Sequence, residues 1–321
     1  MSDVRLVPVA ADEADIRLDR WFKRHFPAVK HGRLEKLLRT GQIRVDGHRV
    51  KASTRLGAGQ SIRVPPLDDE AEDSEAGALR PAVSDRDRSW IRSLVIFRDD
   101  DVIALNKPPG IAVQGGHKVA RHIDGLLDAL AEKGDDRPRL VHRLDRDTSG
   151  VLLIARRASS AAALAEAFRA RDAHKTYWAL VAGVPRPPKG TIDAALVKKA
   201  GRDGMEKMVA DEAGKTAITD YEVVATAGRK AAWLILRPHT GRTHQLRVHC
   251  AAIGTPIVGD AKYGGDKARL DGVPGSDHLH LHARAIDIPH PSGGRLQVTA
   301  ALPPIMAETW RFFGFETKNV D

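Results

Sequence analysis

Residues 141–155 read VHRLDRDTSGVLLIA, so that ten mostly polar residues lead directly into the apolar run Val151–Ala155. This run predicts a buried strand, because it offers no polar face to solvent. Polar side chains packed against a buried strand need a chemical or structural reason, since burying them without partners is unfavourable. The loop that holds Asp145 and Asp147 is therefore the first candidate for a functional site.

Two other interpretations apply to the same loop. The polar spacing over residues 145–150 is similar to the start of a calcium-binding loop, but the twelfth position from Asp145 is Arg156, where a bidentate carboxylate is required. Calcium is set aside on this ground. A turn closed by the Asp147 and Thr148 side chains, with no chemical role, stays open on local evidence.

Short apolar runs separated by turn signals continue on both sides of this strand. They predict further strands at Leu94–Phe97, Val102–Leu105, Tyr177–Ala182, Ala231–Leu236 and Leu279–Ile288. Helices are predicted at Ile123–Glu132, Ala158–Arg171 and His244–Gly254. Because the order shows no regular βαβ repeat, we expect an α+β domain with a mixed, mostly antiparallel sheet. No glycine-rich dinucleotide or nucleoside-triphosphate motif is present.

A strongly basic segment precedes this domain. From Arg17 to Val64, thirteen Lys and Arg residues oppose three acids, a net charge of +10, whereas the whole chain carries +9. The segment predicts two short helices at Ile16–Arg24 and Arg33–Thr40, a hairpin turn at Asp46-Gly47 and a closing strand at 61–64. A solubilising surface and a nucleic-acid docking module both fit this charge. The candidate RNA-binding cations are Arg17, Arg20, Lys23, Arg24, Arg33, Lys36 and Arg39.

An acidic segment separates the two parts. Residues 68–75 include six acids, followed by Gly77, Pro81 and Ser84 and hardly any large apolar residue. We therefore predict a basic domain at 1–66, a flexible linker at 67–89 and a larger domain at 90–321. The linker could also fold back on the basic domain and compete with RNA.

The composition limits the class of protein. With 42% apolar residues and a mean hydropathy of −0.33, the chain is expected to be globular, without a signal peptide or a membrane span. The single Cys250 cannot form an internal disulfide or a zinc site of several thiolates. We expect a cytoplasmic monomer.

Two groups of motifs resemble known families. The stretch 141–155 closely resembles the HRLDxxTSG motif of the RluA/RluC/RluD family of pseudouridine synthases, and further family segments match at Asn106–Gly110, Lys175–Val181 and Leu236–His249. The basic segment, with its Arg17–Trp21 and Leu37–Gly41 stretches, resembles the S4 RNA-binding domain. The resemblance implies an enzyme that isomerises uridine to pseudouridine in structured RNA, with 23S ribosomal RNA as the expected partner and no cofactor.

The resemblance also implies roles for individual residues. Asp145 matches the essential carboxylate, which attacks the sugar or base or takes a proton from the sugar. Since burial would favour its neutral form, a cation must lie nearby, and Arg247 matches the family's partner, with Arg242 the less favoured choice. Tyr177 matches a tyrosine that stacks on the uracil; an ordinary core tyrosine is the alternative.

Three further residues are expected to contact substrate. Arg143 would fill the gap left by a flipped nucleotide, although a simple phosphate contact would use it equally well. Arg242 and Leu246 are the remaining candidates for substrate binding.

Other functions stay open. The same chemistry could act on transfer RNA or several RNAs, and a protein of a different class, a noncatalytic S4-type ribosome-assembly factor, could retain the larger domain as a scaffold. His278, His280 and His282 alternate along a predicted strand and could coordinate a metal, but strand histidines often only pack or form hydrogen bonds. We expect no metal.

Overall fold

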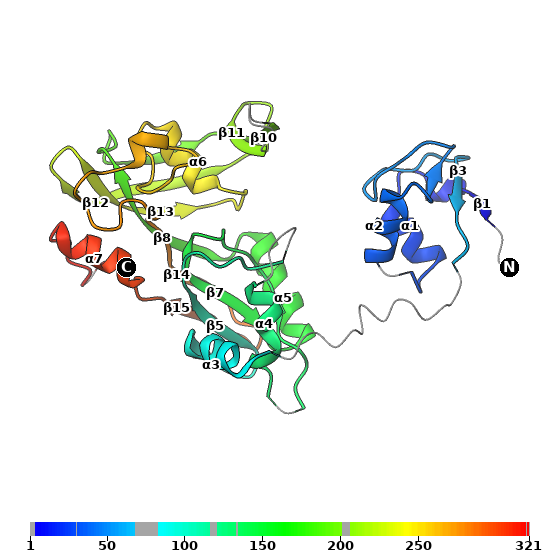
Figure 1. Cartoon of the computed structure of the whole chain (residues 1–321), viewed down its shortest axis with the longest axis horizontal. Helices are drawn as coiled ribbons and strands as arrows, with labels where there is room; N and C mark the ends of the chain where they lie inside the picture. Colours follow the sequence, from blue (N-terminus) through cyan, green and yellow to red (C-terminus); the bar gives the residue numbers. More distant parts are fainter. Residues whose placement is uncertain are drawn as a thin grey trace. The chain divides into compact units, whose positions relative to one another are not determined.

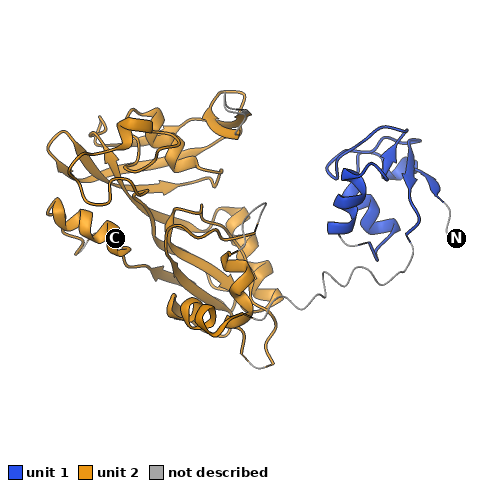
Figure 2. Ribbon diagram, in the orientation of Figure 1, with its two compact units in different colours: residues 1–81 blue, residues 82–321 orange. Residues whose placement is uncertain are grey.

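The computed structural model describes residues 4–29, 31–67, 83–115, 121–132, 134–200, 206–318 and 320, and the chain divides into two compact units (Figures 1 and 2). Unit 1 comprises Met1–Pro81 and unit 2 comprises Ala82–Asp321. The predicted linker falls mostly on residues 68–82, which lie outside the described residues. Its predicted end at residue 89 falls within a helix, α3 (Asp85–Ser93), whose first turn is capped by the Ser84 Oγ accepting a hydrogen bond from Asp87 N at 3.1 Å.

Unit 1 contains two helices and a three-stranded sheet. The helices α1 (Leu18–His25) and α2 (His31–Arg39) confirm the predicted pair, and the sheet has the order β1-β3-β2, with strands Arg5–Pro8 (β1), Ser61–Val64 (β3) and Arg44–Val45 (β2). Asp46 and Gly47 adopt φ values of 49° and 78°, as the predicted hairpin turn requires. The unit has its own hydrophobic core, built from Leu18, Trp21, Phe22, Leu34, Leu37, Leu38, Ile43 and Ile62.

Unit 2 is built on one ten-stranded sheet with the order β4-β5-β7-β14-β8-β13-β12-β9, in which β15 pairs with β14 and β6 with β7. Among the described strands only β7 and β14 pair in parallel, so the predicted mixed, mostly antiparallel sheet is confirmed. The small sheet of β10 (Leu196–Ala200) and β11 (Glu206–Ala210) stands apart. The main strands span Val95–Arg98 (β4), Val102–Lys107 (β5), Arg139–Leu140 (β6), Ser149–Ala155 (β7), His174–Ala182 (β8), Lys189–Asp193 (β9), Ile218–Ala227 (β12), Ala231–Pro238 (β13), Leu281–Pro289 (β14) and Arg295–Thr299 (β15).

Strand β7 is buried along its whole length. Leu152 and Ile154 enter one hydrophobic cluster, whereas Val151 and Leu153 enter another that includes Leu164 of α5 (Ala158–Ala170). Both faces of this part of the sheet are therefore covered, which explains the uninterrupted apolar run in the sequence.

The helix predicted at His244–Gly254 is found as α6 (Gln245–Ala252), whereas the helix predicted at Ile123–Glu132 is only α4 (Ile123–Leu126) followed by the 3-10 turn Leu127–Leu130. Helix α7 (Pro304–Phe312) was not predicted. The Leu127 N–H bonds to the carbonyl of Asp124, three residues back, which tightens the helix at that point. Gly125 within α4 also lowers the helix propensity of this segment.

The single cysteine of the chain lies in unit 2. Cys250 in α6 is fully buried, and burial raises the pKa of its thiol to about 12.

No helix in the described part of the chain combines the length and the apolar character that crossing a membrane requires.

Strands β7 and β14 approach each other closely at Gly150. Gly150 lies opposite Ala283, and it has a φ of +108°. A Cβ atom on Gly150 would lie 2.2 Å from the Ala283 carbonyl oxygen. One residue earlier, Ser149 Oγ lies 2.8 Å from Nδ1 of His282, its partner across the same pair of strands. The parallel pairing therefore depends on glycine at position 150.

We expect Gly150→Ala to destabilise unit 2 far more than Gly110→Ala. Gly110 also has a positive φ, +86°, but open space around its Cβ position, so alanine there meets only the backbone penalty of about 1–2 kcal/mol. Gly150→Ala adds a clash with backbone and should cost more than about 3 kcal/mol. The free energy of unfolding of both variants, from denaturant titration, measures the difference. Equal decreases would contradict the role given to the close approach.

Candidate active site

A cavity of about 160 Å³ lies in unit 2, bordered by the loop before β7, by β8, by the loop after β13 and by α6. Its walls include all six residues of the larger domain that the sequence predicts as catalytic or substrate-binding: Asp145, Tyr177, Arg247, Arg143, Arg242 and Leu246. Three separate motifs of the sequence thus meet in one place. The Asp145 side chain is 29% exposed, so its carboxylate is accessible from this cavity.

The register of the sheet positions two of these residues. Tyr177 on β8 lies opposite Ala283 on β14, and Ala283 lies opposite Gly150 on β7. The loop that ends at Gly150 therefore lies two strands away from Tyr177 in the sheet. Burial, with the negative charge of Asp145, raises the pKa of the Tyr177 hydroxyl, which therefore stays protonated at neutral pH.

Lys107 fixes the loop that carries Asp145. This lysine is fully buried, and its Nζ donates hydrogen bonds to the carbonyl oxygens of Pro108 (2.9 Å), Ile111 (3.0 Å) and Arg146 (2.9 Å). Arg146 Nε in turn donates to the carbonyl of Gly110 at 3.0 Å. Burial lowers the pKa of Lys107 to about 7, although the charges of Asp147 and Asp145 oppose this effect.

In the sequence, Asn106–Gly110 stood out only as a segment that matches the family, so the role of Lys107 was missed. A lysine at the end of the otherwise apolar run Val102–Leu105 was the available signal, because a buried ammonium needs several acceptors.

The nearest ion-pairing partner of Asp145 in the described part of the chain is His244, whose Nε2 lies 3.8 Å from Asp145 Oδ1. The other ring nitrogen, Nδ1, lies 2.6 Å from the Tyr263 hydroxyl. Burial lowers the pKa of His244, against the opposing charge of Asp145. The imidazole is therefore neutral at neutral pH, and a Tyr263 hydroxyl that donates to Nδ1 leaves the ring proton on Nε2, facing Asp145.

Arg247 forms a buried ion pair with a residue that the sequence did not single out. Its Nε and one terminal nitrogen donate to the two oxygens of Asp260, at 2.8 and 2.7 Å, and the Asp260 side chain has no exposed surface. No ion pair within 4.0 Å joins Arg247 to Asp145 among the described residues. Burial lowers the pKa of Arg247, but the bond to Asp260 and the charge of Asp145 more than offset this and raise it overall. Asp145 thus acts on Arg247 through space, while Asp260 holds it.

Gln245 organises the loop between β13 and α6. Its Oε1 accepts from Arg242 N (3.0 Å) and Thr240 Oγ1 (2.7 Å), and its Nε2 donates to the Ile218 carbonyl (3.0 Å). The Arg242 side chain bonds outward to the Thr216 carbonyl at 3.1 Å. Leu246 is buried and Arg143 is exposed at the cavity wall.

The histidines of the region serve as structural hydrogen-bonding groups. His142 Nε2 accepts from Leu153 N at 2.8 Å, and burial, with the charge of Lys175, lowers the pKa of His142 to about 3. His280 bonds to Thr309 and His282 to Ser149. Within the described ranges, no group of three or more His, Cys, Asp or Glu side chains is arranged to hold a metal ion.

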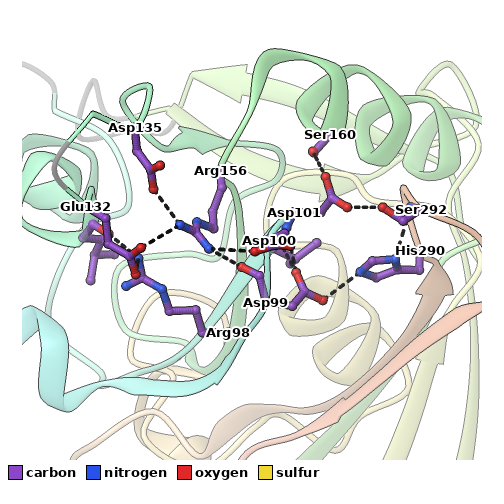
Figure 3. Close-up of polar contacts among 12 residues, drawn as sticks. Arg98, Asp99, Asp100, Asp101, Glu132, Asp135, Arg156, Ser160, His290 and Ser292 are labelled. Atoms are coloured by element: carbon purple, nitrogen blue, oxygen red, sulfur yellow. Dashed lines mark hydrogen bonds and ion pairs between the residues drawn. The ribbon is translucent and has the colours of Figure 1, made fainter.

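A separate polar cluster lies away from the cavity (Figure 3). Arg156, the residue that stands where a calcium loop needs a carboxylate, bonds to the Asp99 carbonyl and the Asp135 carboxylate. Asp101 accepts from Ser160 at the start of α5, and Asp99 pairs with His290 at 2.9 Å. These contacts tie the turn between β4 and β5 to α5 and to the end of β14.

The predicted RNA-binding cations lie on the surface of unit 1, where only Arg33 is half-buried. Arg17 pairs with Asp19 at 2.5 Å, and Arg24 pairs with Glu13 at 3.5 Å. Arg20, Lys23, Lys36 and Arg39 are exposed.

Comparison with known proteins gives consistent matches. The sequence profile of the family described as RNA pseudouridylate synthase matches residues 101–252. The ribosomal large subunit pseudouridine synthase C of Rickettsia felis is 36% identical over 89% of this chain and 93% of its own length. RNA pseudouridine synthase 4, mitochondrial, of Arabidopsis thaliana is 36% identical over 90% of this chain and 74% of its own. The structure of human RNA pseudouridylate synthase domain containing 4 is similar with a TM-score of 0.61 and 28% identity, covering 73% of this chain and 99% of that chain.

The pKa of His244 tests the geometry of the cavity directly. Because the Asp145 charge raises this pKa, Asp145→Asn should lower it further below its ordinary value, whereas Asp147→Asn should leave it in place. Titration of the ring Cε1–H resonance by NMR, assigned with His244→Gln, gives both shifts. A His244 pKa that rises or stays constant in Asp145→Asn would show that the two side chains do not interact.

Proposed function

This chain belongs to the RNA pseudouridylate synthase family, and from this membership we propose that it isomerises specific uridines of large-subunit ribosomal RNA, with Asp145 as the essential carboxylate. The observation that carries the proposal is the accessible Asp145 carboxylate in one cavity with Tyr177 and Arg247. The ribosomal target is supported by relatives named ribosomal large subunit pseudouridine synthase C. A cytoplasmic monomer remains our expectation for the form that acts on this RNA.

The reaction defines what the residues must do. Uracil leaves C1' of its ribose, rotates and rejoins the sugar through C5, so no group is added and no net oxidation occurs. Asp145 either forms a covalent bond to sugar or base, or removes a proton from the sugar. Each role needs the ionised carboxylate at the cavity wall.

Two basic side chains near Asp145 are held in place by the protein. Arg247 supplies a fixed positive charge, because Asp260 binds two of its nitrogens and prevents the guanidinium from turning away. His244 adds a neutral imidazole that can donate through Nε2. Fixed donors of this kind stabilise charge without reorganising during the reaction.

The remaining cavity residues suit the base. The Tyr177 ring offers a stacking face for uracil, and its hydroxyl, which stays protonated, can donate a hydrogen bond. Leu246 offers an apolar contact, and Arg143 and Arg242 are placed to meet the RNA around a flipped nucleotide.

Unit 1 is proposed as an S4-like docking domain. Its exposed Arg20, Lys23, Lys36 and Arg39 project from α1 and α2 and suit phosphate contacts on folded RNA. A large folded target makes better use of such a second domain than a small stem-loop would, which favours ribosomal over transfer RNA.

Asp145→Asn should abolish pseudouridine formation while RNA binding survives, because the two side chains are nearly isosteric. Turnover should fall below about one thousandth of wild type, or about 4 kcal/mol of barrier. Asp147→Asn, in the same loop, is the matched control and should be much milder. Both rates are measured by tritium release from labelled uridine. A mutant rate above that limit would remove Asp145 from its role.

Arg247→Met should lower activity and move the acid limb of the kcat/KM profile to higher pH, because a carboxylate that loses a nearby cation is harder to ionise. Arg242→Met removes a cation from the same cavity wall and should leave the limb in place. If the acid limb moves in Arg242→Met and stays in place in Arg247→Met, Arg242 is the partner of Asp145.

A fragment that begins at Ala82, the first residue of unit 2, should retain turnover at saturating RNA but bind RNA more weakly. Every phosphate that unit 1 binds adds about one unit to the steepness of log affinity against log salt, so the fragment should show a shallower dependence. Titration of both proteins with a ribosomal RNA fragment at several salt concentrations gives the slopes. Equal slopes would show that the basic surface of unit 1 serves solvation only.

A further inference from the structure

A second hollow, of about 700 Å³, opens from the Asp145 cavity and shares with it part of the wall. Five cationic side chains line this hollow, and Asp145 is the carboxylate in its lining. Such a lining suits a polyanion, because repulsion among the cations falls when phosphate enters. The cations are Arg143, Arg169, Arg171, Lys175 and Arg242.

Lys175 is one of three of these cations, with Arg143 and Arg242, that line both the hollow and the cavity. It lies on β8 two residues before Tyr177, so the two side chains point to the same face of the strand. In the sequence, Lys175 stood out only as the first residue of a segment that matches the family.

The ammonium group of Lys175 has no hydrogen bond or ion pair in the described part of the chain, although the side chain is half-buried. Among the other cations of the hollow, Arg169 bonds to Glu166 and Arg242 to the Thr216 carbonyl. Arg143 and Arg171 are exposed to solvent, unlike Lys175. A partly buried charge without a partner is unfavourable in the free protein. An anion that binds beside the ammonium removes this unfavourable contribution.

Lys175 is not the cation that balances Asp145. No ion pair within 4.0 Å joins Lys175 to Asp145 among the described residues, and burial lowers the pKa of Lys175. An anion that enters the hollow from outside the protein can therefore pair with this ammonium. In RNA the uridine base and ribose are neutral, and the charged group is the phosphodiester.

We propose that Lys175 binds an RNA phosphate that flanks the target uridine and so anchors the strand while the base occupies the cavity. This inference rests on the proposed function, since it takes RNA as the ligand. Lys175 is a substrate-positioning residue in this scheme, and the basic hollow carries the strand away from Asp145.

The test combines protein variants with RNA that carries a neutral methylphosphonate in place of one phosphate on either side of the target uridine. Lys175→Met and Lys175→Gln remove the charge, Lys175→Arg retains it, and Lys230→Met, on the exposed turn between β12 and β13, is the control. Affinity is measured at several salt concentrations, and turnover is measured separately.

With unmodified RNA, the neutral variants should bind about tenfold more weakly, in line with the removal of one charge-assisted hydrogen bond. Their salt slope should fall by about one unit. KM should rise with little change in kcat, Lys175→Arg should restore most of the affinity, and Lys230→Met should match wild type. Because the ammonium has no partner in the protein, neither neutral variant should lower the thermal midpoint, whereas removal of a structural lysine would.

At one of the two flanking positions, the methylphosphonate should weaken RNA binding by the wild-type protein about tenfold. The neutral variants should bind this RNA as they bind unmodified RNA. If the effects of variant and methylphosphonate multiply at both flanking positions, Lys175 does not bind either phosphate and the inference is wrong. An unchanged salt slope in the neutral variants would also overturn it. Absence of turnover by wild type would overturn the proposed function instead, while the binding measurements would still decide the role of Lys175.

Discussion

The close approach of β7 and β14 is the constraint on which the rest of unit 2 depends. The two strands are too near for a Cβ atom at position 150, and this contact joins the β4-β5-β7 part of the sheet to the part that begins with β14. The row Gly150, Ala283 and Tyr177 then crosses three strands. The Asp145 loop ends at Gly150, so it lies at the end of this row of residues. The cavity lies beside this row of residues because the Asp145 loop leads directly into β7 at Gly150.

Two buried cations near Asp145, Lys107 and Arg247, have acceptors of their own. Lys107 is bound by three carbonyl oxygens and Arg247 by both oxygens of Asp260. Each bond fixes the position of a positive charge near Asp145 without a direct contact to its carboxylate. The carboxylate thus stays available to the substrate while its surroundings are already oriented. In a partly buried site, such preorganised charges act more strongly than they would in water.

Much of this could be predicted from local sequence, and the rest could not for a physical reason. The apolar run of β7 and the helical spacing of α5 specified their own conformations, and the motif around Asp145 specified the family. The short α4 was missed because apolar spacing does not report the 3-10 bond at Leu127. Asp260 was missed because its importance comes from Arg247, a partner thirteen residues away along the chain. Periodicity describes which way a side chain faces, and not which side chain it meets.

The buried thiol of Cys250 has a practical consequence. A thiol with a pKa near 12 holds almost no thiolate at neutral pH, and thiolate is the form that reacts with oxidants and alkylating reagents. Since the chain has no other cysteine, the folded protein should not react with maleimides. A single cysteine introduced into each unit would therefore accept a fluorophore or a spin label without background. The distance between the units, and its change when RNA binds, thus becomes accessible to spectroscopy on the otherwise native protein.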